Sequence, residues 1–544
     1  MSEYAHGLDE KRIVIRLRSA RGDLERVTLW YGDTACRRTP IDWFPEPMER
    51  VLSDEYSDYW ELTLESPYHR IFYHFELFDG SESCYYYGGV FTDKLVDDRS
   101  EYFKLPFNHR ADIARVPDWV HGAVVYNIFP DSFATSRRHI SLKPTERDFG
   151  GLATHGKLGG TIRGVTENLD YLADLGVNCI YLNPIFAAGE YHKYDLIDYY
   201  HIDPCFGTDE DFRELVDTAH GMGMRVIIDG VFNHCANTNP IFLDTSVRGR
   251  ESAYWDWFFI DGERSSFAER NYKTFADVPY MPKLNTDNDA VIDYFCGVGR
   301  YWIREFGADG WRLDVSDEIS PRFLRRFREA VKAEDADAII IGEVWHGAAE
   351  FLGGDMYDGV MNYGLTKACL DLMAFGTIDA AGFASRLCLL LWRSTGPACE
   401  MMFNLLDSHD TERFLTRVGG DKRREAMALS VMFFFPGIPM LFSGDEIGTE
   451  GGYDPDCRRC FRWERESWDM ELYTLVQRLS ELRRDPCLAR GGCRIAESGS
   501  VVTIERAYGA RRMILHMNPS DTALAAPDGT EIEPWGTVIL EKEM

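Results

Sequence analysis

From residue 124 onward, short apolar runs alternate with longer stretches in which apolar residues recur at helical spacing. The amphipathic stretches, such as 166–175 and 209–222, favour helices. Continuously apolar strands that are joined by helices are typical of parallel strands buried on both faces. The apolar runs are therefore strand candidates, and they lie at 124–129, 178–183, 225–229, 310–315, 338–344, 359–363, 401–406 and 440–442.

Eight strand–helix units over roughly 350 residues predict the α/β class and a (β/α)8 barrel. A doubly wound sheet is the alternative, but the first predicted strand is not followed by its glycine-rich phosphate motif. One connection, 235–289, is much longer than a usual βα loop and rich in aromatic residues. It predicts an inserted lobe after the third strand.

The segments on either side of the barrel show the alternation of half-buried strands. Residues 13–18 and 70–76 alternate apolar and polar side chains, and turn signals separate such runs. The same pattern returns at 501–504 and 513–516. We therefore expect three domains, which are an N-terminal β-sandwich over 1–115, the barrel over 116–486 and a C-terminal β domain over 487–544.

Composition excludes several classes of protein and of partner. The chain has 544 residues, of which 89 are acidic and 59 basic, so its formal net charge is −30. With 45% hydrophobic residues it is typical of a globular enzyme rather than a disordered protein. Negative charge repels the phosphates of nucleic acids and of anionic membranes, so we expect neither as a partner.

Cysteine usage and the first residues point to the cytoplasm. The chain has 13 cysteines without framework spacing, and its beginning has no uninterrupted apolar stretch of signal-peptide length. We therefore expect reduced thiols and a cytoplasmic protein. The C-x-x-C pair at 457 and 460 has no second pair beside it, so we expect no structural zinc there.

Acidic residues stand at or just after four of the predicted strands. They are Asp229, Asp314, Glu343 and Asp410, and each has a His, Arg or Trp nearby in the sequence. A single such acid is usually structural, in an ion pair or a helix cap. The C-terminal strand ends of a barrel converge, however, and carboxylates buried together are costly unless they take part in chemistry.

Two carboxylates about 5 Å apart can carry out retaining glycoside hydrolysis, one as nucleophile and the other as acid and base. Arg312 precedes Asp314 by two residues, so both side chains point to one face of a strand. The positive charge of Arg312 favours the ionised form of the Asp314 carboxyl group, which marks Asp314 as the nucleophile. Glu343 has no adjacent cation in the sequence and is the better candidate for the acid and base.

Four segments, 229–234, 310–314, 342–344 and 404–410, resemble the four conserved regions of the α-amylase family, glycoside hydrolase family 13. Their order and spacing match as well. The resemblance implies that Asp314 is the nucleophile, that Glu343 is the acid and base, and that Asp410 is a third acid. This third acid would hold sugar hydroxyls and stabilise the distorted transition state.

The resemblance also implies how substrate is held. Arg312 would orient the nucleophile, Asp229 would support it, and two histidines would hydrogen-bond the sugar at the cleavage point. Tyr194 would stack on that sugar, unless it is an ordinary aromatic of the barrel rim. The candidate substrate-binding residues are Tyr194, Asp229, His234, Arg312, Trp345, His409, Asp454 and Arg458.

Three features resemble the neopullulanase, cyclomaltodextrinase and maltogenic amylase group of that family. Residues 281–285 are similar to an extra motif of the group, and 454–459 contain its sugar-binding aspartate and arginine. Residues 13–33 resemble the start of its starch-binding-type module. This implies a homodimer in which the module packs over the partner's barrel. A β-sandwich that serves only dimer contact is the alternative.

Two segments depart from the family pattern. Residues 133–137 and 159–161 offer few oxygen ligands where many relatives bind calcium, so we expect no calcium there and no required cofactor. Residues 315–318 also differ from relatives at the acceptor side. That difference leaves open how often the enzyme transfers the glycosyl group to water and how often to a sugar acceptor.

The expected function is an intracellular retaining hydrolase of α-1,4 bonds in cyclodextrins and maltooligosaccharides, with pullulan as a further candidate substrate. An oligo-α-1,6-glucosidase or a glucanotransferase of the same family is the alternative. A non-catalytic sugar-binding homologue is disfavoured because all three acids are retained. A metal-dependent hydrolase is disfavoured because the strand-end histidines do not form a cluster.

Overall fold

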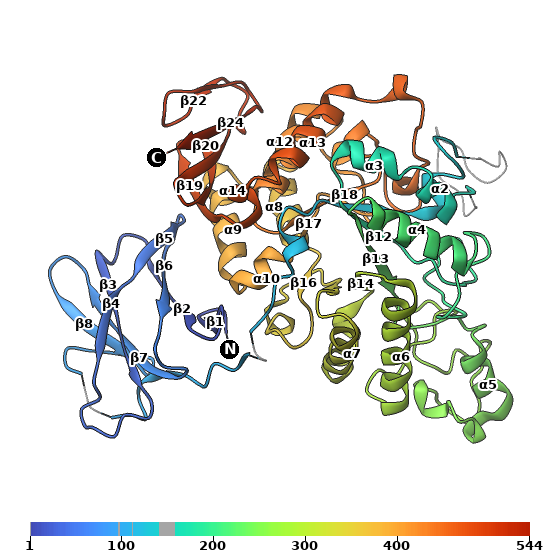
Figure 1. Cartoon of the computed structure of the whole chain (residues 1–544), viewed down its shortest axis with the longest axis horizontal. Coiled ribbons are helices and arrows are strands. Elements are labelled where there is room, and N and C mark those ends of the chain that lie inside the picture. Colours follow the sequence, from blue (N-terminus) through green and yellow to red (C-terminus); the bar gives the residue numbers. More distant parts are fainter. Residues whose placement is uncertain (1, 96–97, 111–112, 141–157, 544) are drawn as a thin grey trace.

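The computed structural model describes residues 2–95, 98–110, 113–140 and 158–543. A central barrel is flanked by an N-terminal β-sandwich and by C-terminal strands (Figure 1). The sandwich protrudes from one side of the barrel, and the C-terminal strands lie next to it. In the described part of the chain, no helix combines the length and the apolarity that a membrane span requires.

The barrel strands form one parallel sheet in the order β16-β15-β14-β13-β12-β11-β18-β17. A parallel bridge between Met361 and Phe403 joins the two ends of this sheet and closes the barrel. All eight predicted strands are confirmed. Their bounds are β11 (Val125–Ile128), β12 (Cys179–Leu182), β13 (Arg225–Gly230), β14 (Gly310–Leu313), β15 (Ile339–Gly342), β16 (Gly359–Val360), β17 (Phe403–Asn404) and β18 (Ile438–Phe442).

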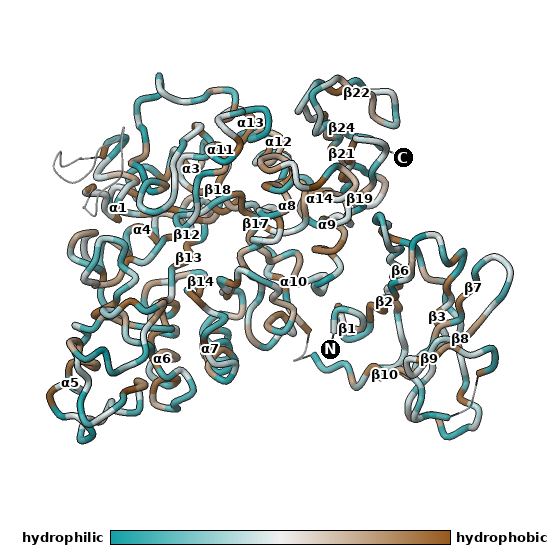
Figure 2. The backbone as a smooth tube through the Cα atoms, turned by 180° about the vertical axis from the view of Figure 1, so that it is seen from behind, coloured by the Kyte–Doolittle hydropathy of each residue, from teal (hydrophilic) through white to brown (hydrophobic). Residues whose placement is uncertain are grey.

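Helices surround the barrel and cover the apolar outer faces of its strands (Figure 1). Figure 2 shows apolar residues recurring along the central strands, while the outer helices alternate apolar and polar positions. The helices are α1 (Pro130–Phe133), α2 (Ile162–Thr166), α3 (Leu169–Leu175), α4 (Asp209–Gly221), α6 (Asp289–Phe306), α7 (Pro321–Glu334), α8 (Tyr363–Met373), α9 (Ala380–Trp392), α10 (Gly396–Glu400), α11 (Phe414–Arg417), α12 (Lys422–Phe434), α13 (Met470–Leu482) and α14 (Pro486–Arg490).

Local sequence explains where the two helices expected after the first strands begin and end. The stretch 166–175 is divided, because α2 ends at Thr166 and α3 begins only after Asn168. The side chain of Asn168 donates back to the carbonyl of Gly164, 2.7 Å away, and to that of Ser136. Helix α4 begins as expected, at a capping box formed by Thr208 and Asp211.

Strand register brings the acidic residues to one end of the barrel. Asp229 lies opposite Arg312 in the β13–β14 pair, and Leu313 lies opposite Gly342 in the β14–β15 pair. One residue further, the amide of Glu343 donates to the carbonyl of Leu313 at 3.0 Å. The carboxyl groups therefore occupy adjacent layers at the C-terminal ends of neighbouring strands.

The predicted lobe after the third strand is present. It contains α5 (Pro240–Arg248) and two short 3-10 turns, Gly249–Glu251 and Trp255–Trp257. Isolated bridges tie it to the barrel, including one between His234 and Lys283. The lobe extends outward beyond α6 in Figure 1.

The predicted N-terminal β-sandwich is confirmed. One antiparallel sheet has the order β1-β2-β6-β5 and the other the order β4-β3-β7-β8-β9, with β10 on β7. Residues on the inner faces form a core of their own. The strands are β1 (Ala5–Gly7), β2 (Arg12–Ala20), β3 (Arg26–Asp33), β4 (Phe44–Pro47), β5 (Glu49–Ser53), β6 (Ser57–Glu65), β7 (Ile71–Phe78), β8 (Ser83–Tyr87), β9 (Val90–Thr92) and β10 (Phe103–Leu105).

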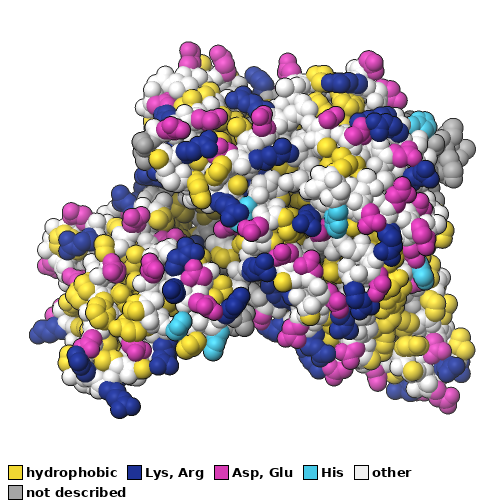
Figure 3. Space-filling model, in the orientation of Figure 1, with side chains coloured by type: hydrophobic (Ala, Val, Ile, Leu, Met, Phe, Trp, Pro, Cys, Tyr) yellow, Lys and Arg dark blue, Asp and Glu magenta, His cyan; other side chains and the backbone are white. Residues whose placement is uncertain are grey.

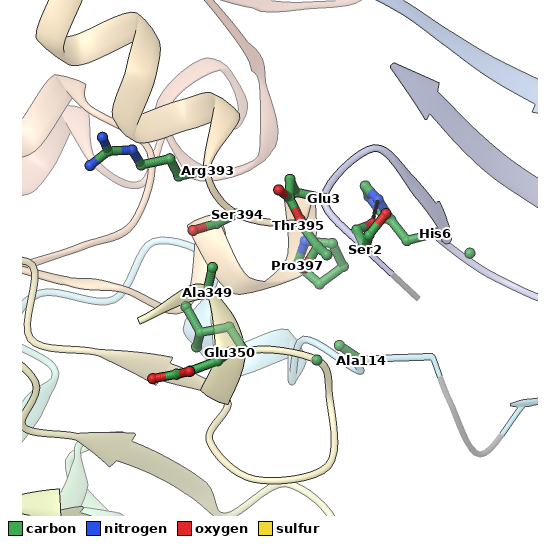
Figure 4. A pocket seen from close by; sticks show the side chains of 13 residues that line it. Ser2, Glu3, His6, Ala114, Ala349, Glu350, Arg393, Ser394, Thr395 and Pro397 are labelled. Atoms are coloured by element: carbon green, nitrogen blue, oxygen red, sulfur yellow. Dashed lines mark hydrogen bonds between the residues drawn. The ribbon is translucent and has the colours of Figure 1, made fainter. Parts of the chain in front are cut away.

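The first residues of the chain dock on the barrel beside α10. A pocket of about 210 Å³ lies between them, and Figure 4 shows Ser2 and His6 on its N-terminal side with Thr395 and Pro397 on the barrel side. Nearby, Arg16 donates to the carbonyl of Ser394 at 2.8 Å. These contacts fix the sandwich against the barrel.

The C-terminal strands form an antiparallel sheet in the order β19-β20-β21-β24 and a separate pair, β22 with β23. Apolar residues of the larger sheet belong to the same core as the barrel helices. The β domain expected there is confirmed. Its strands are β19 (Gly492–Ser498), β20 (Val501–Tyr508), β21 (Arg511–Met517), β22 (Leu524–Ala525), β23 (Glu531–Ile532) and β24 (Thr537–Glu543).

Candidate active site

Arg312 lies at the centre of the acidic strand ends and is fully buried. Its Nη1 donates to both oxygens of Asp229 at 2.9 Å and to Oδ1 of Asp314 at 3.1 Å. Its Nη2 lies 2.8 Å from Oε2 of Glu343. One planar guanidinium therefore contacts three carboxylates from three neighbouring strands, which a single ammonium group could not do with the same geometry.

The sequence-based argument that Glu343 has no cation beside it is wrong. Strand pairing, rather than chain order, places Arg312 next to it. The Oε2 atom of Glu343 also accepts from the amide of Val315 at 2.9 Å, and its Oε1 accepts from Nε1 of Trp345 at 3.1 Å. Proximity to Arg312 therefore does not distinguish the nucleophile from the acid and base.

Asp314 and Glu343 behave as an interacting pair. Burial raises the pKa of Asp314 well above its ordinary value, and the charge of Glu343 adds to this rise while Arg312 opposes it. Asp314 therefore binds a proton more tightly than an isolated carboxyl group does. Within the described residues, Oδ2 of Asp314 is buried and accepts no hydrogen bond. Asp314 thus keeps one carboxylate oxygen available for another contact.

Asp410 is held in the ionised form. Burial alone would raise its pKa, but His409 and the positive charge of Arg458 lower it. The Nε2 atom of His409 is 3.0 Å from Oδ2 of Asp410, and Nη2 of Arg458 is 3.1 Å from Oδ1. An ionised carboxylate at this place can accept hydrogen bonds from hydroxyl groups.

Tyr194 is connected to the acids rather than isolated on the rim. Its hydroxyl donates to Oδ2 of Asp229 at 3.2 Å and contacts Nε2 of His409. Its ring lies parallel to the imidazole of His409, with the two centroids 5.6 Å apart. These contacts set the orientation of both rings.

His234 is neutral in this environment. Burial lowers its pKa to about 3, and the nearby ammonium of Lys283 acts in the same direction. Its ring stacks on Phe275 at 4.8 Å between centroids. A neutral imidazole can donate one hydrogen bond to a sugar hydroxyl without bringing a second charge to the carboxylates.

The two ends of the site have different chemistry. On one side Trp345, which is 45% exposed, stacks on Tyr363 with 4.0 Å between ring centroids. On the other side Arg458 contacts Oδ1 of Asp454 at 2.9 Å, and the hydroxyl of Tyr191 lies 2.9 Å from the same guanidinium. A flat aromatic surface suits the apolar face of a sugar ring, and the charged pair suits its hydroxyls.

The structure brings all eleven predicted site residues together. A cavity of about 440 Å³ is lined by Asp314, Glu343, Asp410, Tyr194, His234, Trp345, Asp454 and Arg458. The remaining three, Asp229, Arg312 and His409, do not line the cavity but contact residues that do. Their individual roles in binding and catalysis stay predictions.

The comparisons with known proteins agree with this geometry. A model of the alpha amylase catalytic domain matches residues 127–486, and one of the alpha amylase N-terminal ig-like domain matches residues 1–109. The chain belongs to the α-amylase family. It is therefore a glycoside hydrolase, and the family resemblance drawn from the four motifs is confirmed.

Among its relatives in the α-amylase family, a cyclomaltodextrinase of Geobacillus thermopakistaniensis is 42% identical over 90% of this chain and 84% of its own. An intracellular maltogenic amylase of Bacillus subtilis is 39% identical over 89% of this chain and 83% of its own. A solved structure of a cyclomaltodextrinase superposes with a TM-score of 0.90 at 35% identity, covering 99% of this chain and 96% of that chain.

Sequence reasoning missed several supporting residues. Tyr181 donates to Oδ2 of Asp229 at 2.7 Å, and the amide of Asn183 lies 3.0 Å from Nδ1 of His409. Both lie at the end of the second predicted strand, so the strand-end rule could have found them. Tyr191 and Phe275 come from loops, where no periodicity marks a site residue.

Neither a metal cluster nor a function for the C-x-x-C pair is seen among the described residues. Among the described residues, no group of three or more His, Cys, Asp or Glu side chains could hold a metal ion. Near the expected calcium position, Arg137 contacts Asp170 at 2.6 Å. The absence of calcium there stays a prediction. Cys457 donates its S–H to the carbonyl of His409 at 3.1 Å, which gives it a packing role.

Proposed function

We propose that the chain is a retaining α-glucan hydrolase that cleaves α-1,4 bonds of cyclodextrins and maltooligosaccharides, with pullulan as a further substrate. The observation that carries this proposal is the contact of one buried arginine with Asp314 and Glu343 at the wall of a single cavity. The names of the relatives, cyclomaltodextrinase and maltogenic amylase, support the choice of substrates.

In the first chemical step, Oδ2 of Asp314 attacks the anomeric carbon while Glu343 protonates the departing glycosidic oxygen. The C–O bond to the leaving sugar breaks, and an ester bond forms between Asp314 and the remaining glycosyl unit. Glu343 enters this step in its protonated form and leaves it as a carboxylate. Arg312 keeps the carboxylate of Asp314 oriented through its contact with Oδ1.

In the second step, Glu343 takes a proton from water, and the resulting hydroxide attacks the anomeric carbon. The ester bond breaks, Asp314 leaves as a carboxylate, and Glu343 is again protonated. Asp410 accepts hydrogen bonds from sugar hydroxyls during both steps, because His409 and Arg458 keep it ionised. A sugar hydroxyl in place of water gives transglycosylation.

The first test is Asp314→Asn, assayed on a cyclodextrin. Because an amide is a poor nucleophile, we expect kcat to fall by more than about a thousandfold. The matched control is Asp335→Asn. Asp335 follows α7 at the opposite end of β15 from Glu343, so kcat should remain near the wild-type value. Hydrolysis by Asp314→Asn near the wild-type rate would exclude this nucleophile.

Product analysis separates the proposed activity from the alternatives. Incubation with cyclodextrin, pullulan and starch, followed by resolution of products by chain length, should yield maltooligosaccharides from cyclodextrin and panose from pullulan. Isomaltose as the best substrate would favour an oligo-α-1,6-glucosidase. Products longer than the substrate would favour a glucanotransferase. No products from any of the three glucans, with sugar binding retained, would favour the non-catalytic homologue.

We further propose a cytoplasmic homodimer joined through the N-terminal module. The likeness of residues 13–33 to the module of the group supports the dimer, and the intracellular relative of Bacillus subtilis supports the location. Sedimentation equilibrium of the full chain should give twice the chain mass of 62.4 kDa. A single species at the chain mass at micromolar concentration would contradict the dimer, and cell fractionation checks the location.

A further inference from the structure

A third cavity lies where the three parts of the chain meet, away from the active site. Its volume is about 280 Å³. The N-terminal sandwich contributes Arg16 and Glu61, the barrel contributes Glu400 and Arg483, and the C-terminal sheet contributes Arg506. In Figure 1 the strands β5 and β6, the helices α9 and α10 and the strand β19 approach one another at this junction.

Two guanidinium groups of this cavity are buried, since Arg483 is 2% exposed and Arg506 is 3% exposed. They donate to backbone carbonyls. Arg483 reaches Gly437 at 2.7 Å, and Arg506 reaches Gly491 at 2.8 Å and Phe434 at 2.9 Å. Neither forms an ion pair with a carboxylate of the described chain. The Nε–H of Arg483 is buried there without a hydrogen-bond partner.

Among the carboxylates that line the cavity, only Glu400 acts electrostatically on both arginines, and it forms an ion pair with neither of them in the described chain. Glu61 is 2.7 Å from Arg16, and Glu400 is 3.5 Å from Nδ1 of His121. Arg490, which also lines the cavity, pairs with Asp118. The cavity therefore carries surplus positive charge in a protein whose net charge is −30.

A buried cation without a counterion is costly, and a buried donor without an acceptor adds to that cost. Burial and the neighbouring Arg506 lower the pKa of Arg483 to about 9, which shows the strain on its charged form. A small anion in the cavity would supply the missing negative charge. Arginine is also the side chain best suited to phosphate oxygens.

We propose that this junction cavity binds a small oxyanion, either inorganic phosphate or a phosphate group carried on a sugar, held by Arg483 and Arg506. The volume is below that of cavities that hold drug-sized ligands, which fits an ion or a phosphorylated monosaccharide. Gly437 lines the cavity and immediately precedes β18. The site therefore lies at the N-terminal end of a barrel strand, opposite the catalytic end, and its ligand does not compete with glucan.

Binding there would join the end of α13 to β20, because Arg483 follows that helix and Arg506 lies on that strand. The expected effect is on stability, since a ligand that binds only the folded protein raises its unfolding temperature. The inference does not depend on the proposed hydrolase activity.

The test is isothermal titration calorimetry of the full chain with sodium phosphate, at an ionic strength held constant with sodium chloride. We expect saturable binding of one phosphate per chain at millimolar concentration or below, with a matching rise of the thermal midpoint. A parallel titration with a hexose phosphate distinguishes the two sources. If the hexose phosphate binds more tightly than inorganic phosphate, the natural ligand is a sugar-borne phosphate group. If it binds equally or more weakly, the natural ligand is the free ion. No saturable binding in either titration overturns the proposal.

Variants locate the binding to this cavity. Arg506→Gln should lower the phosphate affinity about tenfold or more, and Arg506→Lys should lower it less. Glu400→Gln removes a repelling charge and should raise the affinity about threefold, which tests the site even if Arg506→Gln fails to fold. Arg494→Gln is the matched control, because Arg494 is an exposed residue of β19 outside the cavity lining. Equal affinities in Glu400→Gln and the wild type would contradict the assignment.

Discussion

Glu446 is a buried carboxyl group whose proton binding affects stability rather than catalysis. It follows β18, is fully buried and accepts hydrogen bonds from the hydroxyls of Tyr126, at 2.7 Å, and Tyr171. Burial raises its pKa from 4.5 to about 7, although the two tyrosines oppose the rise. The folded protein therefore holds this proton more tightly than the unfolded chain does.

Stability should fall as pH rises because of Glu446. The pKa of Glu446 is higher in the folded than in the unfolded protein. The loss of unfolding free energy therefore begins near pH 4.5 and is complete above about pH 7. Glu446→Gln removes the titration but keeps an acceptor for both tyrosines. The unfolding free energy of the variant relative to wild type should rise by about 3 kcal/mol over this range, measured by urea denaturation. A difference that is constant with pH would contradict the argument.

At the residue level, the sequence could predict which acids converge and that Arg312 lies beside Asp314, but not that Arg312 also contacts Glu343. The positions of Asp314 and Glu343 at strand ends were sufficient to bring them to one cavity. The link between Arg312 and Glu343 depends on the pairing of β14 with β15, which no local pattern encodes. Adjacency in the chain is therefore a weaker guide to electrostatics than adjacency in the sheet.

The turn after β14 stores backbone strain at the active site. Val315 has φ 43° and ψ 46°, the left-handed region that β-branched residues rarely adopt. In this conformation its amide donates to Oε2 of Glu343 at 2.9 Å. The strained residue thus lies between the two carboxylates that the proposed mechanism uses, as strained residues often do at functional sites.

Glycine at position 315 should relieve this strain. A left-handed conformation costs an L-residue about 1 to 2 kcal/mol and costs glycine almost nothing. Val315→Ala is the matched control, because it removes the same methyl groups and keeps the strain. We expect Val315→Gly to exceed Val315→Ala by about 1 kcal/mol in unfolding free energy, measured by urea denaturation. Equal stabilities would show that the backbone relaxes in both variants.

At the level of elements, buried strands were predictable because their residues are apolar on both faces. Helix bounds were harder to predict from the sequence. The break at Asn168, for example, depends on hydrogen bonds to Gly164 and Ser136 that form only in the folded chain. Loop residues such as Tyr191 had no signal at all. Their positions follow from how separate βα loops meet at the barrel mouth.

The charge of the whole molecule is spread rather than focused. Figure 3 shows acidic side chains over the visible face, interspersed with lysines and arginines. An uncharged glucan gains nothing from long-range attraction to such a surface. The surplus of acid therefore bears on solubility and not on substrate capture.

Substrate capture should accordingly be insensitive to salt. We expect kcat/KM for a cyclodextrin to change by less than about twofold between about 0.05 and 0.5 M sodium chloride, since screening acts on charge–charge interactions. Initial rates at low substrate concentration check this. A steep decline with salt would indicate that surface charge guides the substrate after all.

Closure of the barrel by its last strands also constrains how the protein is made. The first barrel strand, β11, pairs with β18, and Tyr126 hydrogen-bonds Ser443, which is 317 residues later in the chain. At about 5 to 20 residues per second, a ribosome needs roughly 15 to 60 s to cover that separation. Throughout this interval one edge of β11 lacks its partner. The nascent barrel therefore exposes an unpaired strand edge, a surface open to wrong pairing, until β18 has been synthesised.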